Sequence, residues 1–175
     1  LIVGAEDASL IGKTLLDISG EIKKNPEETV FKLIESNNIK VASFNMNPED
    51  IANFMKLDWV VTGSDGNSGH PRKYGSFPRK YNKYVKEEKV IDLATFINNS
   101  SSKTAEILRI PNRGILKTGY YADVIIFNPN TFKDVADYKD AFKYADGLEY
   151  TIINGQLVID QGKFTGNLNG KVLTN

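Results

Sequence analysis

Cysteine is absent from this 175-residue chain, and histidine occurs once, at position 70. Without cysteine the chain forms no disulfide and offers no thiolate to a metal or a substrate. A single histidine cannot supply the three protein ligands that a catalytic zinc usually takes. The sequence therefore excludes cysteine chemistry and predicts that any metal site built from this chain alone is incomplete.

Charge of one sign is not in excess either, because 22 lysines and arginines balance 22 aspartates and glutamates. A balanced chain has no long-range field that attracts nucleic acid or an anionic membrane. Apolar runs fall far short of the roughly 20 residues of a membrane span, and the first residues lack the pattern of a signal peptide. We expect a soluble piece of a longer protein, either cytoplasmic or exported.

The first hundred residues predict helices and strands in alternation. Apolar residues recur at helical spacing in 13–24 and in 26–36, and Asn25 followed by Pro26 is typical of a helix start. Asn47 and Pro48 repeat this signal ahead of another helix.

Between and after these helices lie two runs that predict strands, residues 39–44 and residues 59–62. Strands joined through one short helix are typical of a parallel sheet, so the two runs are expected to be parallel neighbours. Residues 66–84 are rich in glycine, proline, aromatic and basic residues and predict a long loop, a feature that is commonly functional. Residues 87–110 predict a helix pair.

The last third of the chain is expected to be rich in strands. Residues 121–127 contain a Val-Ile-Ile run, and apolar residues in 150–160 flank Asn154 and Gly155. Asn-Gly is the favoured pair for a two-residue type I′ turn, so 150–160 predicts a hairpin.

One carboxylate stands out against this background. The apolar run 59–62 leads directly into Gly63, Ser64, Asp65 and Gly66. Residues just past the ends of strands form the active-site rim in parallel α/β proteins. Asp65 is therefore the leading candidate for a catalytic residue.

Five stretches in this order carry a resemblance to a known family. They are residues 63–66 (Gly-Ser-Asp-Gly), 70–72 (His-Pro-Arg), 74–79 (Tyr-Gly-Ser-Phe-Pro-Arg), 119–123 (Gly-Tyr-Tyr-Ala-Asp) and the Val/Ile-rich hairpin around Asn154 and Gly155. Together they resemble the carboxyl-terminal portion of the amidohydrolase superfamily, and most closely the N-acyl-D-amino-acid deacylases, also called D-aminoacylases. The ending, residues 165–173, is similar to that family too.

The resemblance implies an α/β plus β fold in two parts. Residues 1–112 are expected to be the last strands, active-site loop and closing helices of a (β/α)8 amidohydrolase barrel. Residues 113–175 are expected to be β-sandwich strands of the composite domain. A complete barrel needs about 250 residues, so this chain would carry only a part of one.

The resemblance also implies an activity. In the family the aspartate of the Gly-Ser-Asp-Gly motif lies beside a zinc site, takes a proton from the attacking water and passes it to the leaving nitrogen, a role that falls here to Asp65. Arg72 is assigned to the substrate's carboxylate, because a guanidinium binds a carboxylate through two parallel hydrogen bonds. The family's cysteine and histidine ligands are absent, so zinc is expected in the full-length enzyme and neither zinc nor turnover in this chain alone. Asp65 is the one residue here that such a metal could contact.

Four further residues are candidates for lining or orienting the pocket. They are Ser64, Gly66, His70 and Tyr74. For His70 an orienting or structural role is favoured over metal ligation, and Arg79, with the same chemistry as Arg72, is expected to pair with a structural acid.

Two alternatives remain open at this point. A cyclic amidohydrolase of the dihydroorotase or hydantoinase type shares the barrel-plus-sandwich plan. A non-catalytic, β-rich accessory or assembly domain would also account for the alternating apolar pattern after residue 121. Because a partial parallel sheet exposes unpaired edges, a dimer or larger homo-oligomer is expected.

Overall fold

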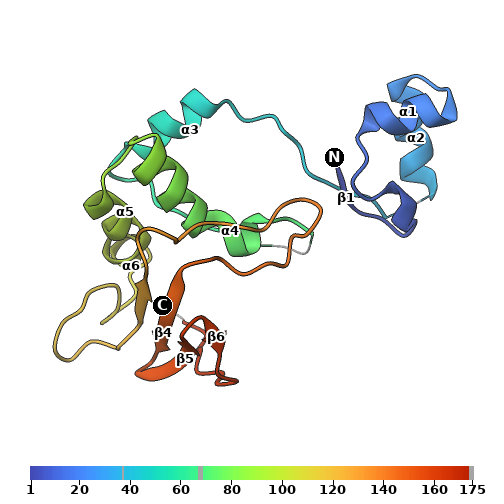
Figure 1. The fold of residues 1–175 in the computed structure, drawn as a ribbon. Coiled ribbons are helices and arrows are strands. Elements are labelled where there is room, and N and C mark those ends of the chain that lie inside the picture. Colours follow the sequence, from blue (N-terminus) through green and yellow to red (C-terminus); the bar gives the residue numbers. More distant parts are fainter. Residues whose placement is uncertain (37, 67–68, 174–175) are drawn as a thin grey trace.

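The computed structural model describes residues 1–36, 38–66 and 69–173. Figure 1 shows β1, α1 and α2 as a lobe that an extended segment connects to α3 and the rest of the chain. The elements are β1 (Ile2–Gly4), the 3₁₀ turn η1 (Ala8–Leu10), α1 (Leu15–Ile22), α2 (Pro26–Ser36), β2 (Lys40–Val41), α3 (Pro48–Met55), α4 (Arg72–Arg79), the π-helix η2 (Lys80–Glu87), α5 (Leu93–Ser100), α6 (Ser102–Ile107), β3 (Val124–Phe127), β4 (Leu148–Ile153), β5 (Gln156–Asp160) and β6 (Lys163–Phe164).

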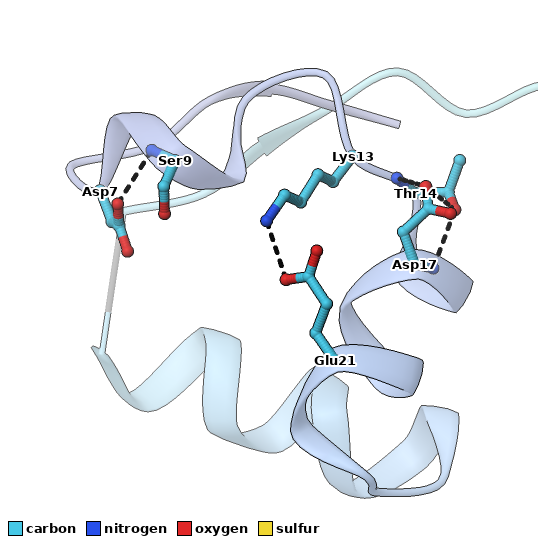
Figure 2. A network of polar contacts seen from close by, with 6 residues as sticks. All are labelled: Asp7, Ser9, Lys13, Thr14, Asp17 and Glu21. Atoms are coloured by element: carbon cyan, nitrogen blue, oxygen red, sulfur yellow. Dashed lines mark hydrogen bonds and ion pairs between the residues drawn. The ribbon is translucent and has the colours of Figure 1, made fainter.

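Helix α1 begins with a capping box. The Thr14 hydroxyl accepts the Asp17 backbone N–H at 3.2 Å, and the Asp17 carboxylate accepts the Thr14 backbone N–H at 2.8 Å, as Figure 2 shows. Lys13 also bonds Glu21 at 2.8 Å, which ties the segment before α1 to its last turn. Local side chains therefore fix where this helix starts.

The two helix starts that the sequence predicted are confirmed. The Asn25 side chain accepts the Glu28 backbone N–H at 2.8 Å at the start of α2. The Asn47 side chain accepts the Glu49 backbone N–H at 2.9 Å at the start of α3. Each amide satisfies a backbone donor that a first helical turn leaves without an intrahelical partner.

The expected pair of parallel strands is wrong. Strand β2 covers only Lys40–Val41 and pairs with β1 in antiparallel register, with Ile2 opposite Val41. Residues 59–62 form no strand. An apolar, β-branched run becomes a strand only where a neighbouring strand satisfies its backbone groups, and the described residues place no such neighbour beside 59–62.

The loop expected over residues 66–84 is also wrong over most of its length, because α4 and η2 occupy residues 72–87. Pro78 lies inside α4 and has no N–H to donate to the preceding turn. Downstream the backbone widens into a π-helix, in which the Glu88 N–H donates to the Lys83 carbonyl at 2.8 Å. Proline and glycine suggested a loop, but the helix forms because its inner face is buried.

The carboxyl-terminal strands form one antiparallel sheet in the order β3-β4-β5-β6. The hairpin of β4 and β5 is confirmed, with Ile153 opposite Gln156 across the two-residue turn. Asn154 and Gly155 have φ values of 50° and 80°, the left-handed conformation that a type I′ turn requires. Strand β3 and the helix pair α5 and α6 are confirmed too.

The core joins these helices to the sheet. Tyr81, Ile91, Phe96 and Phe132 are buried together. The Tyr81 ring lies 5.7 Å from Phe96 and from Phe132, and its hydroxyl donates to the Pro129 carbonyl at 3.0 Å. Helix η2, which carries Tyr81, is thereby fixed against both α5 and the segment after β3.

Many large apolar side chains remain exposed on the described surface. Those more than half exposed in the amino-terminal half include Leu16, Phe31, Ile34, Val41, Phe44, Met46, Phe54 and Trp59. Among the described residues no helix is long and apolar enough to cross a membrane.

Candidate functional site

Asp65 lies in the loop that leads into α4 and not at the end of a strand, because residues 59–62 form none. Its backbone has a φ of 43°, and its side chain is 83% exposed. The next residue, Gly66, passes close to the first turn of α4, where an added Cβ would lie 3.3 Å from the Cα of Lys73. The loop therefore presents the Asp65 carboxylate at the start of α4.

Arg72, the first residue of α4, binds Asp65 in two ways. The Arg72 Nη2 atom lies 2.6 Å from the Asp65 Oδ2 atom, and the Arg72 Nε–H donates to the Asp65 backbone carbonyl at 2.8 Å. The Arg72 guanidinium thus binds both the carboxylate and the backbone carbonyl of Asp65. Charge-assisted bonds of this kind are short and directional. The structure brings the two leading candidates into direct contact.

His70 sits beside this pair and orients the helix start. Its Nδ1 atom accepts the Arg72 backbone N–H at 3.1 Å, and its Nε2 atom lies 3.4 Å from the Tyr138 hydroxyl. Burial and then the positive charge of Arg72 lower the pKa of His70, while Asp65 opposes the shift. An imidazole that accepts at Nδ1 is neutral with its proton on Nε2, so His70 positions the backbone of Arg72 and holds no second proton.

The other candidates are distributed more widely. Tyr74 is half-buried and packs edge-to-face on Tyr144, with ring centroids 5.1 Å apart. Ser64 is half-buried and Gly66 is exposed. Arg79 binds Asp134 at 3.3 Å, as expected for a structural pair.

A buried lysine next to this loop was missed by the sequence analysis. Lys80 is 5% exposed, and its ammonium donates to the Thr62 hydroxyl at 2.6 Å. Desolvation lowers the pKa of Lys80. The contact links the junction of α4 and η2 to the segment three residues before Asp65. No sequence signal marks Lys80, because the stretch around it reads as a loop.

A second arginine–aspartate pair lies away from this site, at the hairpin turn. The Arg113 guanidinium binds the Asp123 carboxylate through Nη1 and the Asn154 side-chain oxygen through Nη2, the latter at 2.6 Å. Its guanidinium carbon also lies 4.1 Å from the centroid of the Tyr121 ring. A cavity of about 440 Å³ opens beside it, and Asp65, Arg72 and His70 take no part in lining that cavity.

Metal ligands do not gather around Asp65. Within residues 1–36, 38–66 and 69–173 no group of three or more histidine, aspartate or glutamate side chains could hold a metal ion. The Nδ1 atom of His70 accepts the Arg72 backbone N–H, and its Nε2 atom faces the Tyr138 hydroxyl. The residues described do not fit a catalytic zinc centre, which needs three protein ligands around one ion.

The sequence of this region matches a known family. A profile described as "Amidohydrolase family" aligns with residues 31–159, which include the Asp65 loop, α4 and the hairpin. The chain belongs to the amidohydrolase family. The match covers well over half of its length.

Similar proteins include a D-aminoacylase, N-acyl-D-glutamate deacylases and a dihydroorotase. A D-aminoacylase of Alcaligenes xylosoxydans xylosoxydans is 30% identical over 168 residues, which cover 94% of this chain and 34% of that protein. A crystal structure of D-aminoacylase superposes with a TM-score of 0.89 at 29% identity, over 100% of this chain and 37% of that one.

A third similar protein is the N-acyl-D-glutamate deacylase of Bordetella bronchiseptica, solved with zinc and a phosphonate inhibitor that mimics the tetrahedral intermediate. It matches with a TM-score of 0.76 at 26% identity, over 84% of this chain and 31% of that one. This chain therefore spans about a third of the length of the relatives it matches.

Proposed function

We propose that this chain is the carboxyl-terminal part of an N-acyl-D-amino-acid deacylase in which Asp65 moves the protons of amide hydrolysis. One observation carries the proposal: the exposed Asp65 carboxylate and the Arg72 guanidinium meet at the start of α4, in a chain that resembles D-aminoacylase along 94% of its length. An acid next to a carboxylate-binding group is what deacylation of an N-acyl amino acid needs.

The proposed chemistry assigns one task to each residue. Water attacks the carbonyl carbon of the amide, and Asp65 takes the proton that the water gives up. Asp65 then delivers this proton to the nitrogen as the carbon–nitrogen bond breaks, which yields a carboxylic acid and a free amino acid. Arg72 holds the substrate's carboxylate and so sets which amide bond faces Asp65.

The proposal extends to the architecture. Residues 1–112 would complete a barrel with preceding segments, and residues 113–175 would contribute strands to a sandwich. The exposed apolar side chains of α1, α2 and residues 41–59 support such partners, since monomeric proteins rarely leave so much apolar surface uncovered. The zinc of the complete enzyme would be held by residues outside this chain, so we propose that the chain alone hydrolyses nothing, and that the complete protein is a homo-oligomer.

Replacing Asp65 in the complete enzyme tests the proposed role. With N-acetyl-D-leucine as substrate, Asp65→Asn is expected to lower kcat by about 10²–10⁴-fold, because the amide cannot take up the water's proton. Asp58→Asn, an exposed change seven residues earlier, serves as the matched control and should keep full activity. Bound zinc and the thermal unfolding midpoint, measured on each variant, should match the wild type.

The choice of substrate tests the proposed reaction. The complete enzyme should hydrolyse N-acetyl-D-leucine, and the L-enantiomer should be a poor substrate. An enzyme that opened hydantoin or dihydroorotate and left N-acyl-D-amino acids intact would contradict the proposal in favour of a cyclic amidohydrolase.

A further inference from the structure

Arg72 makes two contacts with Asp65, one to its side chain and one to its backbone, and only the first can break when a ligand binds. The carboxylate contact involves a side chain that is 83% exposed, whereas the second contact joins Arg72 Nε to a backbone carbonyl. We propose that Arg72 determines specificity by releasing Asp65 only when a substrate carboxylate takes its place. The inference rests on the proposed function, and it adds a condition: the proton-transfer group is tied until the correct substrate binds.

Exchange at Arg72 costs little. An ion pair with an exposed carboxylate adds little net free energy, so a second carboxylate of equal charge can replace the first. The incoming carboxylate offers the same two acceptor oxygens to the guanidinium. Two carboxylates at one guanidinium repel each other, so arrival of the substrate pushes the Asp65 side chain away from Arg72.

The remaining contacts keep the released carboxylate close to the substrate. The Arg72 Nε–H holds the Asp65 carbonyl at 2.8 Å, and His70 holds the Arg72 backbone N–H at 3.1 Å. Neither contact uses the Asp65 carboxylate. Only that side chain has to turn, and these contacts keep it next to a carboxylate bound at Arg72.

The second arginine of α4 offers a matched comparison. Arg79 binds Asp134 at 3.3 Å, but the Asp134 side chain is only 18% exposed. It packs against α4 so closely that a Cβ added to Gly75 would lie 3.3 Å from the Asp134 Cβ. Because the Asp134 carboxylate is mostly enclosed, we expect this pair to stay closed, and it serves as the control.

The experiment compares N-acetyl-D-leucine with N-acetyl-D-leucinamide in the complete enzyme, following release of the primary amine. The two substrates share the scissile bond, but the second lacks the carboxylate. We expect kcat/KM to be about 100-fold lower for the leucinamide, with kcat as well as KM affected, because Asp65 stays bound to Arg72.

Free propionate then distinguishes release from simple binding. Propionate should occupy Arg72 and raise leucinamide hydrolysis severalfold, while it competes with N-acetyl-D-leucine and slows that reaction. If propionate leaves leucinamide hydrolysis unchanged or inhibits it, Arg72 is a binding residue only and the inference is wrong.

Two variants complete the test. Arg72→Gln should hydrolyse the leucinamide at least as fast as the wild type and should no longer respond to propionate, whereas Arg79→Gln should respond as the wild type does. A lower leucinamide rate in Arg72→Gln, with zinc content and unfolding midpoint unchanged, would overturn the inference, since Arg72 would then hold Asp65 in its working position. Absence of N-acetyl-D-leucine hydrolysis in the wild type would instead refute the proposed function.

Discussion

Two arginine–aspartate pairs in this molecule have the same chemistry and opposite surroundings. Asp65 meets Arg72 in an open loop, where their side chains are 83% and 35% exposed. Asp123 meets Arg113 at the hairpin turn, where their side chains are 33% and 11% exposed. The carboxylate of the first pair is open to solvent, and the second pair is enclosed by its neighbours.

The difference lies in what else each arginine contacts. Besides Asp123, Arg113 binds the Asn154 side chain and covers the Tyr121 ring. Asp123 also accepts the Asn154 backbone N–H at 2.8 Å. Contacts shared in this way depend on one another, so the hairpin pair acts as a structural unit, whereas we propose a functional role for the Asp65 pair.

Removing the enclosed arginine should have the largest effect. We expect Arg113→Gln to lower the free energy of unfolding by about 2–3 kcal/mol, because Asp123 and Asn154 lose their partner where water has little access. Urea unfolding followed by circular dichroism measures the change. A loss below about 0.5 kcal/mol would show that the pair is no stronger than an exposed one.

Two substitutions of Asn154 separate the contribution of the turn conformation from that of the side-chain hydrogen bonds. Asn154→Ala should cost about 2 kcal/mol, because it removes the side-chain contacts and places a residue with a Cβ but no local hydrogen bond at a φ of 50°. Asn154→Gly keeps the turn conformation without strain and should cost about 1 kcal/mol. Equal losses in the two variants, again from urea unfolding, would mean that the backbone conformation contributes nothing.

The pKa of His70 is sensitive to the neighbouring Asp65–Arg72 pair. Burial and Arg72 lower the pKa of His70 below its ordinary value of 6.5. The folded state then binds fewer protons than the unfolded state, so stability falls as the pH drops through 6.5 and levels off below the folded pKa. Proton NMR of the imidazole should give a midpoint below 6.5, and Arg72→Gln should move that midpoint upward. A midpoint above 6.5 in the wild type would contradict this account.

The smallest effect is expected at the open pair itself. Arg72→Gln and Asp65→Asn should each change the free energy of unfolding by less than about 0.5 kcal/mol, since both side chains contact water. The contrast with Arg113→Gln under identical urea conditions tests the comparison directly. If Arg72→Gln lowered the free energy of unfolding by more than about 1.5 kcal/mol, the Asp65–Arg72 pair would be a structural pair like Asp123–Arg113.

Local signals in the sequence predicted much of the fold. Asn25 and Asn47 mark helix starts, and Asn154 with Gly155 marks a turn, because each interaction is made within a few residues. The strands predicted at 39–44 and 59–62 fail in this way: only Lys40–Val41 of the first run is a strand and the second run forms none, since a strand depends on a neighbour that the local sequence does not specify. Helix α4 was missed because Pro78 and Gly75 suggest a loop, while burial of the face they share decides the outcome.

The sequence named the members of the candidate site but not their contacts. Motif resemblance identified Asp65 and Arg72 but gave them separate tasks, and their mutual contact depends on how the loop folds back over seven residues. The structural role expected for Arg79 is confirmed by its contact with Asp134. Lys80 escaped notice because burial of a lysine depends on packing that no short pattern encodes.

The wide turn of η2 has a consequence for changes in chain length. A π-helix accommodates one more residue per turn than an α-helix, so deleting a single residue between 82 and 86 would let the segment tighten to the regular pitch. A deletion absorbed in this way would leave the residues that follow aligned with Tyr81, which the Pro129 carbonyl and two phenylalanine rings hold in place. An inserted residue has no wider turn to absorb it, and would rotate the following segment by about 100° and misalign Ile91 and Phe96 with the aromatic cluster they complete.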